Sequence, residues 1–299
     1  MQFAKNKAYK NHINGVVLVN KERGISSNKL VNRVKYRLNA DKAGHLGTLD
    51  VLGEGLLPIT LGKGTKLFEY YLNKDKVYKT VFKFGQTTDT LDLEGEVTNR
   101  NDVIVSQADL QEATKAFIGR QAQMPPIYSA KKIKGQKAYD LARAGMQVDL
   151  KPKGIEVYSI KVLKQIDINT FEFEVHCSSG TYIRSLCRDI AERLSTYGVM
   201  LSIQRTKCGD FYLKDACSLQ DIENGNYKII KLESLFDYDC IYLTKAKEDK
   251  ILNGVSLSID KDIFTEHRGS GNIKVFGEQD FLGIGEIIDN KLKLTLRLI

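Results

Sequence analysis

The hydrophobic pattern of the chain predicts several short strands. Residues 15–20 (GVVLVN) form a continuous apolar run, which is typical of a buried strand. Residues 76–84 (KVYKTVFKF) alternate instead. One face of a strand would carry Tyr78, Thr80, Phe82 and Phe84, and the other face two lysines. Strands are also expected at residues 56–60 and, as a pair, at residues 158–166 and 170–179.

Apolar residues recur at helical spacing in other segments, which predicts amphipathic helices. The segment 26–38 places four aliphatic residues on one face, and Ser26 or Ser27 precedes them as the expected N-cap. A basic stripe on another face, more often a solvated surface than a binding site, consists of Lys29, Arg33 and Arg37. Further helices are expected around residues 64–72, 106–119 and 181–198.

Strands outnumber helices and do not alternate strictly with them. This order predicts an α+β fold with a mixed or antiparallel central sheet and flanking helices. The end of the chain contains only short β-like runs, such as FLGIGEII and LKLTLRLI. We therefore expect a large domain over residues 1–240 and a small β domain over residues 241–299.

The distribution of charge supports a polyanionic partner for the larger domain. The chain has 45 Lys and Arg against 37 Asp and Glu, a net charge of +8. Residues 241–299 contain nine basic and nine acidic residues, so the whole excess lies in residues 1–240. Such an excess favours RNA or DNA through phosphate neutralisation. Many basic proteins bind no nucleic acid, so charge alone leaves the question open.

The remaining composition excludes several classes of protein. No apolar run is long enough to span a bilayer, and the first 15 residues lack the apolar core of a secretory signal. The five cysteines show no CxxC pair, which indicates reduced thiols in a cytoplasmic protein. The four histidines offer no zinc cluster, and residues 62–65 lack the spacing of a phosphate-binding loop. We expect chemistry without a metal or a cofactor, or no chemistry at all.

Residues 44–59 (GHLGTLDVLGEGLLPI) carry the most informative pattern. The glycines within residues 42–54 predict a loop whose backbone can approach a ligand closely. The loop places the carboxylate of Asp50 close to one histidine, His45. Taken alone, an aspartate in a glycine-rich loop more often caps a turn than carries out chemistry.

This segment resembles the catalytic motif of the bacterial TruB family of tRNA pseudouridine synthases, whose pattern is GHxGTLDPxATGxLPI. Four other blocks resemble motifs of the same family in the same order, and several long motifs in fixed order are more specific than one. They are NKERGISS (20–27), KVYKTVFKFGQTTDTLDLEGEV (76–97), QMPPIYSAKKIKGQKAYDLARAG (123–145) and CSSGTYIRSLCRDI (177–190).

The resemblance implies a pseudouridine synthase fold with a PUA-like C-terminal domain. It also implies cofactor-free isomerisation of uridine to pseudouridine at position 55 in the T loop of tRNA. Asp50 would attack the flipped-out nucleotide, at ribose C1′ or at the pyrimidine ring. Arg184 would pair with Asp50, and Tyr78 would stack on the uracil and act as a candidate proton relay. From the residues alone, Arg184 could be an ordinary surface arginine of a helix, and a core tyrosine would be the better interpretation of Tyr78.

The resemblance also assigns residues to RNA binding. His45 would fill the space left by the flipped base, and Tyr182 and Ile203 would line the pocket. Phosphate and ribose contacts are expected from Lys21 and from a basic segment that contains Lys131, Lys132, Lys134 and Lys137 between Tyr128 and Tyr139. For this segment a solvated basic loop is an equally good interpretation.

The chain departs from the family pattern at some positions. Val51 stands where proline is usual, Gly53 and Glu54 where Ala-Thr is usual, and Ile203-Gln204 where Leu-Arg is usual. Glu54 brings a negative charge to a site that must receive RNA. These changes bear on affinity more than on reaction type, because every expected catalytic side chain is present.

Two other functions are compatible with parts of this pattern. One is a non-catalytic protein that binds or folds tRNA, although such a protein would be expected to lose Asp50 or Arg184. The other is a phosphohydrolase, but the DxDx[TV] pattern of a common class is absent at Asp50. We expect a monomeric cytoplasmic enzyme whose partner is the T arm of tRNA, with the acceptor stem as a candidate second contact.

Overall fold

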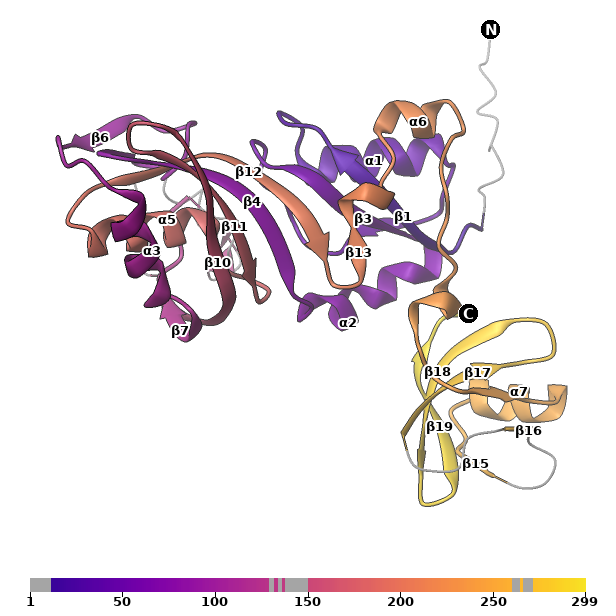
Figure 1. Cartoon of the computed structure of the whole chain (residues 1–299). Helices are drawn as coiled ribbons and strands as arrows, with labels where there is room; N and C mark the ends of the chain where they lie inside the picture. The colour runs from indigo at the N-terminus through magenta and orange to yellow at the C-terminus, as the bar shows by residue number, and fades with distance from the viewer. Residues whose placement is uncertain (1–11, 129–131, 134–135, 138–149, 260–263, 266–270) are drawn as a thin grey trace, which may run out of the picture.

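The computed structural model describes residues 12–128, 132–133, 136–137, 150–259, 264–265 and 271–299. The described residues form two main sheets in two separate bodies (Figure 1). The larger body contains a curved nine-stranded sheet with helices against it, and the smaller contains a six-stranded sheet near the C-terminus. Two small two-stranded sheets complete the topology.

The large sheet is mixed, as the sequence predicts. Along it the strands follow the order β1-β3-β12-β4-β11-β10-β7, with β2 paired to β3 and β13 paired to β12. Only β3 and β12 run parallel; the other pairs in this sheet are antiparallel. The strands are β1 Gly15–Lys21, β2 Ala43–His45, β3 Glu54–Leu61, β4 Lys76–Phe84, β7 Gly119–Gln123, β10 Lys153–Asp167, β11 Thr170–Cys177, β12 Gly198–Cys208 and β13 Phe211–Tyr212.

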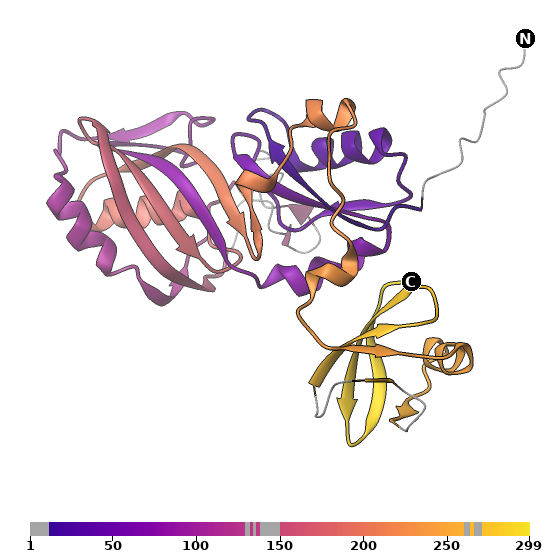
Figure 2. The ribbon, with the colours of Figure 1, turned by 45° about the vertical axis from the view of Figure 1, so that its right-hand side comes forward.

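Helices cover the two ends of this sheet (Figure 2). At one end α1 (Ser27–Arg37) contacts β2 and β3, and α6 (Leu219–Glu223) lies beside α1. At the other end α3 (Gln107–Lys115) contacts β10, and α5 (Ile183–Arg193) contacts β12. The remaining elements of the larger body are η1 Gly62–Leu67, α2 Phe68–Leu72, β5 Gln86–Thr88, β6 Val97–Arg100, β8 Lys132–Ile133, β9 Gln136–Lys137, η2 Leu213–Asp215 and η3 Leu232–Leu235.

Local sequence explains where α1 begins and which side it buries. The Ser26 hydroxyl accepts a hydrogen bond from the backbone N–H of Lys29 at 3.2 Å, so Ser26 is the N-cap. Leu30, Val31 and Val34 are buried against β1 and β3, as their spacing predicts. The three basic residues of the stripe are exposed, which agrees with the solvated-surface interpretation.

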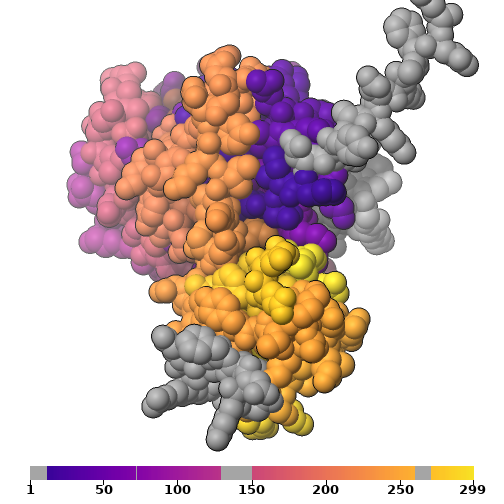
Figure 3. Space-filling view, turned by 90° about the vertical axis from the view of Figure 1, so that its right-hand side faces the viewer, coloured from indigo at the N-terminus to yellow at the C-terminus, as the bar shows by residue number. Residues whose placement is uncertain are grey.

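The smaller body begins with β14 at Cys240, one residue before the expected boundary. Its strand order is β15-β19-β18-β17-β14-β16, and it has a separate apolar core. Figure 3 shows this body (yellow) packed directly against the larger one, where Ile284 and Leu298 share a cluster with Val16 and Leu232. Its elements are β14 Cys240–Tyr242, α7 Lys245–Leu252, β15 Leu257–Ser258, β16 Phe264–Thr265, β17 Gly271–Phe276, β18 Phe281–Ile288 and β19 Lys291–Arg297.

Several local predictions were wrong. The expected loop over residues 42–54 contains the short strand β2, which pairs with β3. The helix expected over 106–119 ends at Lys115, and β7 begins at Gly119. The helix expected over 181–198 ends at Arg193. The sequence pattern predicted neither α7 nor the long strand β12, although β12 lies in the middle of the sheet.

Candidate active site

Polar side chains hold the loop between β2 and β3 through hydrogen bonds to its backbone. Ser27, the first residue of α1, donates its hydroxyl to the carbonyl of Leu49 at 2.8 Å and accepts from the Leu49 N–H at 2.9 Å. The loop also closes on itself, because the N–H of Gly53 donates to the carbonyl of Asp50 at 3.0 Å. These bonds fix the backbone on both sides of the Asp50 carboxylate.

Lys21 supports this loop from the end of β1. Its side chain is completely buried, and its ammonium group donates to the carbonyls of Glu22 at 3.1 Å, Val51 at 3.3 Å and Gly53. Burial lowers the pKa of Lys21 to about 8, while the negative charges of Asp50 and Glu54 act in the opposite direction. The expected contact between Lys21 and RNA phosphate stays a prediction, and the position of the ammonium group, which points into the protein, does not favour it.

Arg205 is a second buried cation that contacts the loop, and the sequence pattern did not identify it as a site residue. It is 1% exposed. Nε donates to the carbonyl of Leu56 at 2.8 Å, Nη2 to Gly47 at 3.0 Å and Nη1 to Thr48 at 3.4 Å. Its only signal in the sequence was its position directly after Ile203-Gln204, where Leu-Arg is usual in the family.

Asp50 and Arg184 lie in contact, although they come from distant parts of the chain. Oδ2 of Asp50 is 3.0 Å from Nη2 of Arg184. The carboxylate side chain is 50% exposed and the arginine side chain 9% exposed. The pair therefore combines an accessible carboxylate with a guanidinium that is held inside the protein.

Asp92 is the second carboxylate on the same guanidinium. Its Oδ2 lies 2.9 Å from Nη1 of Arg184, and its side chain is only 5% exposed. Nη1 also donates to the carbonyl of Thr90 at 3.1 Å, and Nη2 to the carbonyl of Tyr128 at 3.2 Å. Asp92 lies in the segment 76–97, which resembles a family motif, but its polar neighbours gave no indication that it is buried.

Tyr78 and Ile203 pack beside the loop in the main core. Both are almost fully buried, at 8% and 9% exposure, and share a cluster with Leu49. A Cβ atom on Gly53 would lie 3.5 Å from Cγ2 of Ile203, so the glycine permits this close contact. Burial raises the pKa of Tyr78 well above its usual range, although the nearby Arg205 acts in the opposite direction. The Tyr78 hydroxyl therefore stays protonated at neutral pH.

Tyr182 and His45 lie on different elements near the Asp50 loop, Tyr182 at the start of α5 and His45 on β2. Tyr182 is the N-cap of α5, and its backbone N–H and C=O bond the side-chain amide of Gln123 at 2.8 and 3.1 Å. His45 lies on β2 and lines a separate cavity of about 520 Å³ beside α1 and η1. Its Nδ1 is buried without a hydrogen-bond partner in the part of the chain that the structure describes. Burial, and after it the charge of Arg205, lowers the pKa of His45, so the ring is neutral at pH 7.

The basic segment is only partly described. Lys131, Lys134 and Tyr139 lie outside the described residues. Lys132 and Lys137 belong to the short strands β8 and β9, of whose side chains nothing is described.

Among the described residues 12–128, 132–133, 136–137, 150–259, 264–265 and 271–299, no three His, Cys, Asp or Glu side chains are grouped as a metal site would require. Within the same residues no helix is long and apolar enough to cross a membrane.

The fold has a close counterpart among solved structures. A chain in the structure of an H/ACA RNP bound to a substrate RNA containing 2′-deoxyuridine matches with a TM-score of 0.68 at 20% identity. The match covers 95% of this chain and 85% of that chain. This match confirms the expected fold class. The chain has the α+β architecture of a pseudouridine synthase fold, with an additional C-terminal sheet.

Sequence comparison narrows the class to one family. The profile described as "TruB family pseudouridylate synthase (N terminal domain)" matches residues 35–183. The tRNA pseudouridine synthase B of Francisella tularensis subsp. novicida is 37% identical over 94% of this chain and 93% of its own length. That of Clostridium tetani is 36% identical over 96% of this chain and 100% of its own length. The chain belongs to the TruB family of pseudouridylate synthases.

Proposed function

We propose that this protein isomerises uridine to pseudouridine at position 55 in the T loop of tRNA, with Asp50 as the nucleophile. Its family membership and its relatives named tRNA pseudouridine synthase B support pseudouridine formation in tRNA. The observation that carries the finer proposal is the half-exposed Asp50 carboxylate on the buried Arg184 guanidinium. Such a carboxylate is paired with a fixed positive charge and is accessible to a nucleotide.

Arg184 is the positioning residue in this mechanism. The two terminal nitrogens of its guanidinium group make different contacts, because Nη1 is held by Asp92 and the Thr90 carbonyl while Nη2 reaches Asp50. A guanidinium fixed in this way orients the Asp50 carboxylate by charge pairing. Asp50 then attacks ribose C1′ or the pyrimidine ring, and the glycosidic bond between C1′ and N1 breaks. After the base has turned, C5 forms the new bond to C1′ and the bond to Asp50 breaks, which regenerates the carboxylate. C5 then loses its proton and N1 gains one, so the product is an isomer of the substrate.

The target base has to leave its stack before Asp50 can reach it. Flipping costs about a few kcal/mol, and stacking on an aromatic ring returns about 1–3 kcal/mol per base. We assign the stacking surface to Tyr78, beside Ile203 and Leu49 in the core next to the loop. Burial raises the pKa of Tyr78, so its hydroxyl is protonated and can take up the C5 proton only while it passes its own proton on.

We assign the chemistry and the T-arm contacts to residues 1–240, which hold the net positive charge, and an acceptor-stem contact to residues 241–299. We further propose that the enzyme acts as a monomer in the cytoplasm. In this assignment Tyr182, His45 and the segment with Lys131 and Lys132 contact RNA around the target uridine.

A direct experiment is to incubate the purified protein with an unmodified tRNA transcript and map pseudouridine at each uridine. We expect one modified position, uridine 55. The matched control is a transcript with cytidine at that position, which should remain unmodified. Modification at another position would reject the T-loop assignment, and tRNA binding without any pseudouridine would favour the non-catalytic tRNA-binding function instead.

A further inference from the structure

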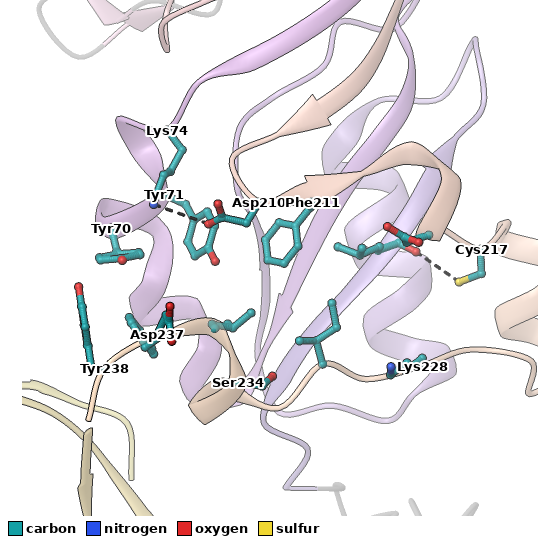
Figure 4. A pocket seen from close by; sticks show the side chains of 15 residues that line it. Tyr70, Tyr71, Lys74, Asp210, Phe211, Cys217, Lys228, Ser234, Asp237 and Tyr238 are labelled. Carbon is teal, nitrogen blue, oxygen red and sulfur yellow. Dashed lines mark hydrogen bonds and ion pairs between the residues drawn. The ribbon is translucent and has the colours of Figure 1, made fainter. Parts of the chain in front are cut away.

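A second cavity, of about 930 Å³, lies apart from the Asp50 site (Figure 4). Its walls come from β1, the end of α2, the turn after β12 and the segment 228–238 that leads to the C-terminal body. None of its lining residues belongs to the Asp50 loop, to β4 or to α5. Its chemistry is therefore independent of the proposed isomerisation.

Aromatic rings form much of this cavity. Tyr71 stacks on Phe211 with ring centroids 5.2 Å apart, and Tyr70 meets Phe236 edge to face at 5.2 Å. Tyr238 lies beside them, stacked on Phe236 at 5.9 Å. The face of an aromatic ring carries negative charge density and attracts ammonium groups.

The cavity already accommodates one cation from the chain itself. Nζ of Lys74 lies 5.2 Å from the centre of the Tyr70 ring and 6.0 Å from that of Tyr71. The same nitrogen is 3.6 Å from Oδ2 of Asp210 (Figure 4). The cavity thus already contains an ammonium group that contacts both aromatic rings and a carboxylate.

The cavity has capacity for more positive charge. Its lining contains three carboxylates, including Asp215 and Asp237, against the ammonium groups of Lys74 and Lys228. Within the described part of the chain, Asp215 and Asp237 make no ion pair, and both are exposed. In a chain of net charge +8, a locally acidic cavity does not suit a phosphate group.

A buried hydroxyl without a partner also points to a ligand. Tyr71 is 1% exposed, and among the described residues its Oη has no hydrogen-bond partner. In Figure 4 this hydroxyl points towards the middle of the lining side chains. A phenol oxygen can accept a hydrogen bond from an ammonium N–H, and buried polar atoms are normally paired.

We propose that this cavity binds a small organic polycation of the aliphatic polyamine class. One ammonium group lies against the rings of Tyr70 and Tyr71 and donates to the Tyr71 hydroxyl. A second ammonium group pairs with Asp237 at the rim, and the methylene chain between them covers the apolar wall. Lys74 competes with the ligand for the same rings.

Isothermal titration of the full-length protein with spermidine tests this site. We expect saturable binding of one molecule per chain, and Asp237→Asn should weaken it at least about threefold because one charge pair is lost. Asp289→Asn, an exposed acid in the C-terminal body, is the matched control and should bind like wild type. Unsaturable binding, or equal losses in the two variants, would reject the site and indicate diffuse attraction only.

Two further variants separate a cation from other ligands. Lys74→Met removes the internal competitor, so spermidine should bind more tightly, whereas Lys79→Met on the exposed face of β4 should change nothing. If Lys74→Met weakens spermidine binding, or if adenosine monophosphate binds this cavity instead, the polycation assignment is wrong. Tyr71→Phe keeps the ring on Phe211 and removes only the hydroxyl, so it should fold normally and weaken spermidine binding; unchanged binding would overturn the role given to that hydroxyl.

Discussion

Asp92 and Arg184 form a buried ion pair, with Oδ2 and Nη1 separated by 2.9 Å and both side chains less than 10% exposed. Asp50 meets the other end of the same guanidinium at 3.0 Å. Arg184 therefore serves two carboxylates with unequal surroundings. The buried one holds the arginine, and the accessible one is free to meet a substrate.

Asp92→Asn should slow catalysis without removing the nucleophile. The amide keeps the shape of the side chain but removes the charge that holds Nη1 of Arg184, so Arg184 is held less firmly and Asp50 is oriented less well. We expect kcat to fall about tenfold to 100-fold with little change in KM. Asp102→Asn, an exposed carboxylate elsewhere in the chain, is the matched control and should be neutral. A rise in KM with an unchanged kcat would instead assign Asp92 to RNA contact.

Asp50→Asn should abolish isomerisation and leave tRNA binding within a few-fold of wild type. The amide is not a nucleophile, whereas the 50% exposed side chain contributes little to the fold. Single-turnover reactions with excess enzyme provide the measurement. Product above the uncatalysed background would rule out Asp50 as the attacking group.

Tyr78→Phe and Tyr78→Leu should behave differently. Phenylalanine keeps the aromatic face and the packing against Leu49 and Ile203, so it should bind tRNA well and lose most turnover. Leucine also removes the ring, whose stacking is worth about 1–3 kcal/mol per base, so both binding and turnover should fall. Wild-type turnover by Tyr78→Phe would leave the residue as a stacking platform only.

The strongest periodic signals predicted the fold well. The apolar run of β1, the alternation in β4 and the helical spacing of α1 all gave elements of the right type at nearly the right residues. β12 was missed because its residues are a mixture of apolar, polar and charged types. Its place in the middle of the sheet depends on long-range pairing with β3 and β4, which local pattern does not contain.

The candidate site was only partly predictable for a similar reason. Asp50, Arg184 and Lys21 were singled out through the resemblance, Lys21 for a phosphate contact. Lys21, Asp92 and Arg205 are charged residues that the structure buries. Their burial is possible because backbone carbonyls and other side chains satisfy them, and such partners come from distant segments. Hydrophobic periodicity treats these residues as exposed, so it cannot reveal them.

Two departures from the family pattern also have a structural explanation. Glu54 and Gln204 stand opposite each other where β3 and β12 run parallel, with Nε2 of Gln204 3.4 Å from Oε1 of Glu54. Glu54 also contributes negative charge near the buried Lys21 ammonium group. The carboxylate that raised a question about RNA affinity is therefore partly compensated within the protein.

Lys21 should make the stability of the fold depend on pH in the mildly alkaline range. Its pKa is lowered from 10.5 to about 8 in the folded protein, mainly by burial. Between these two values the unfolded chain binds more protons than the folded chain at this residue. The free energy of unfolding should therefore rise as pH increases from 8 towards 10.5, and this contribution is lost as pH falls through 8.

Urea unfolding of wild type and Lys21→Met at pH 7, 8, 9 and 9.5 measures this dependence. Methionine retains the length of the side chain but has no proton to release, so its stability should rise less with pH than that of wild type. The comparison uses slopes because the substitution also removes hydrogen bonds to the carbonyls of Val51 and Gly53, which lowers stability at every pH. Lys63→Met, an exposed lysine, should keep the wild-type slope. Parallel curves for wild type and Lys21→Met would mean that the buried ammonium group keeps its ordinary pKa, and the carbonyls of the Asp50 loop would then hold a fully charged lysine throughout this range.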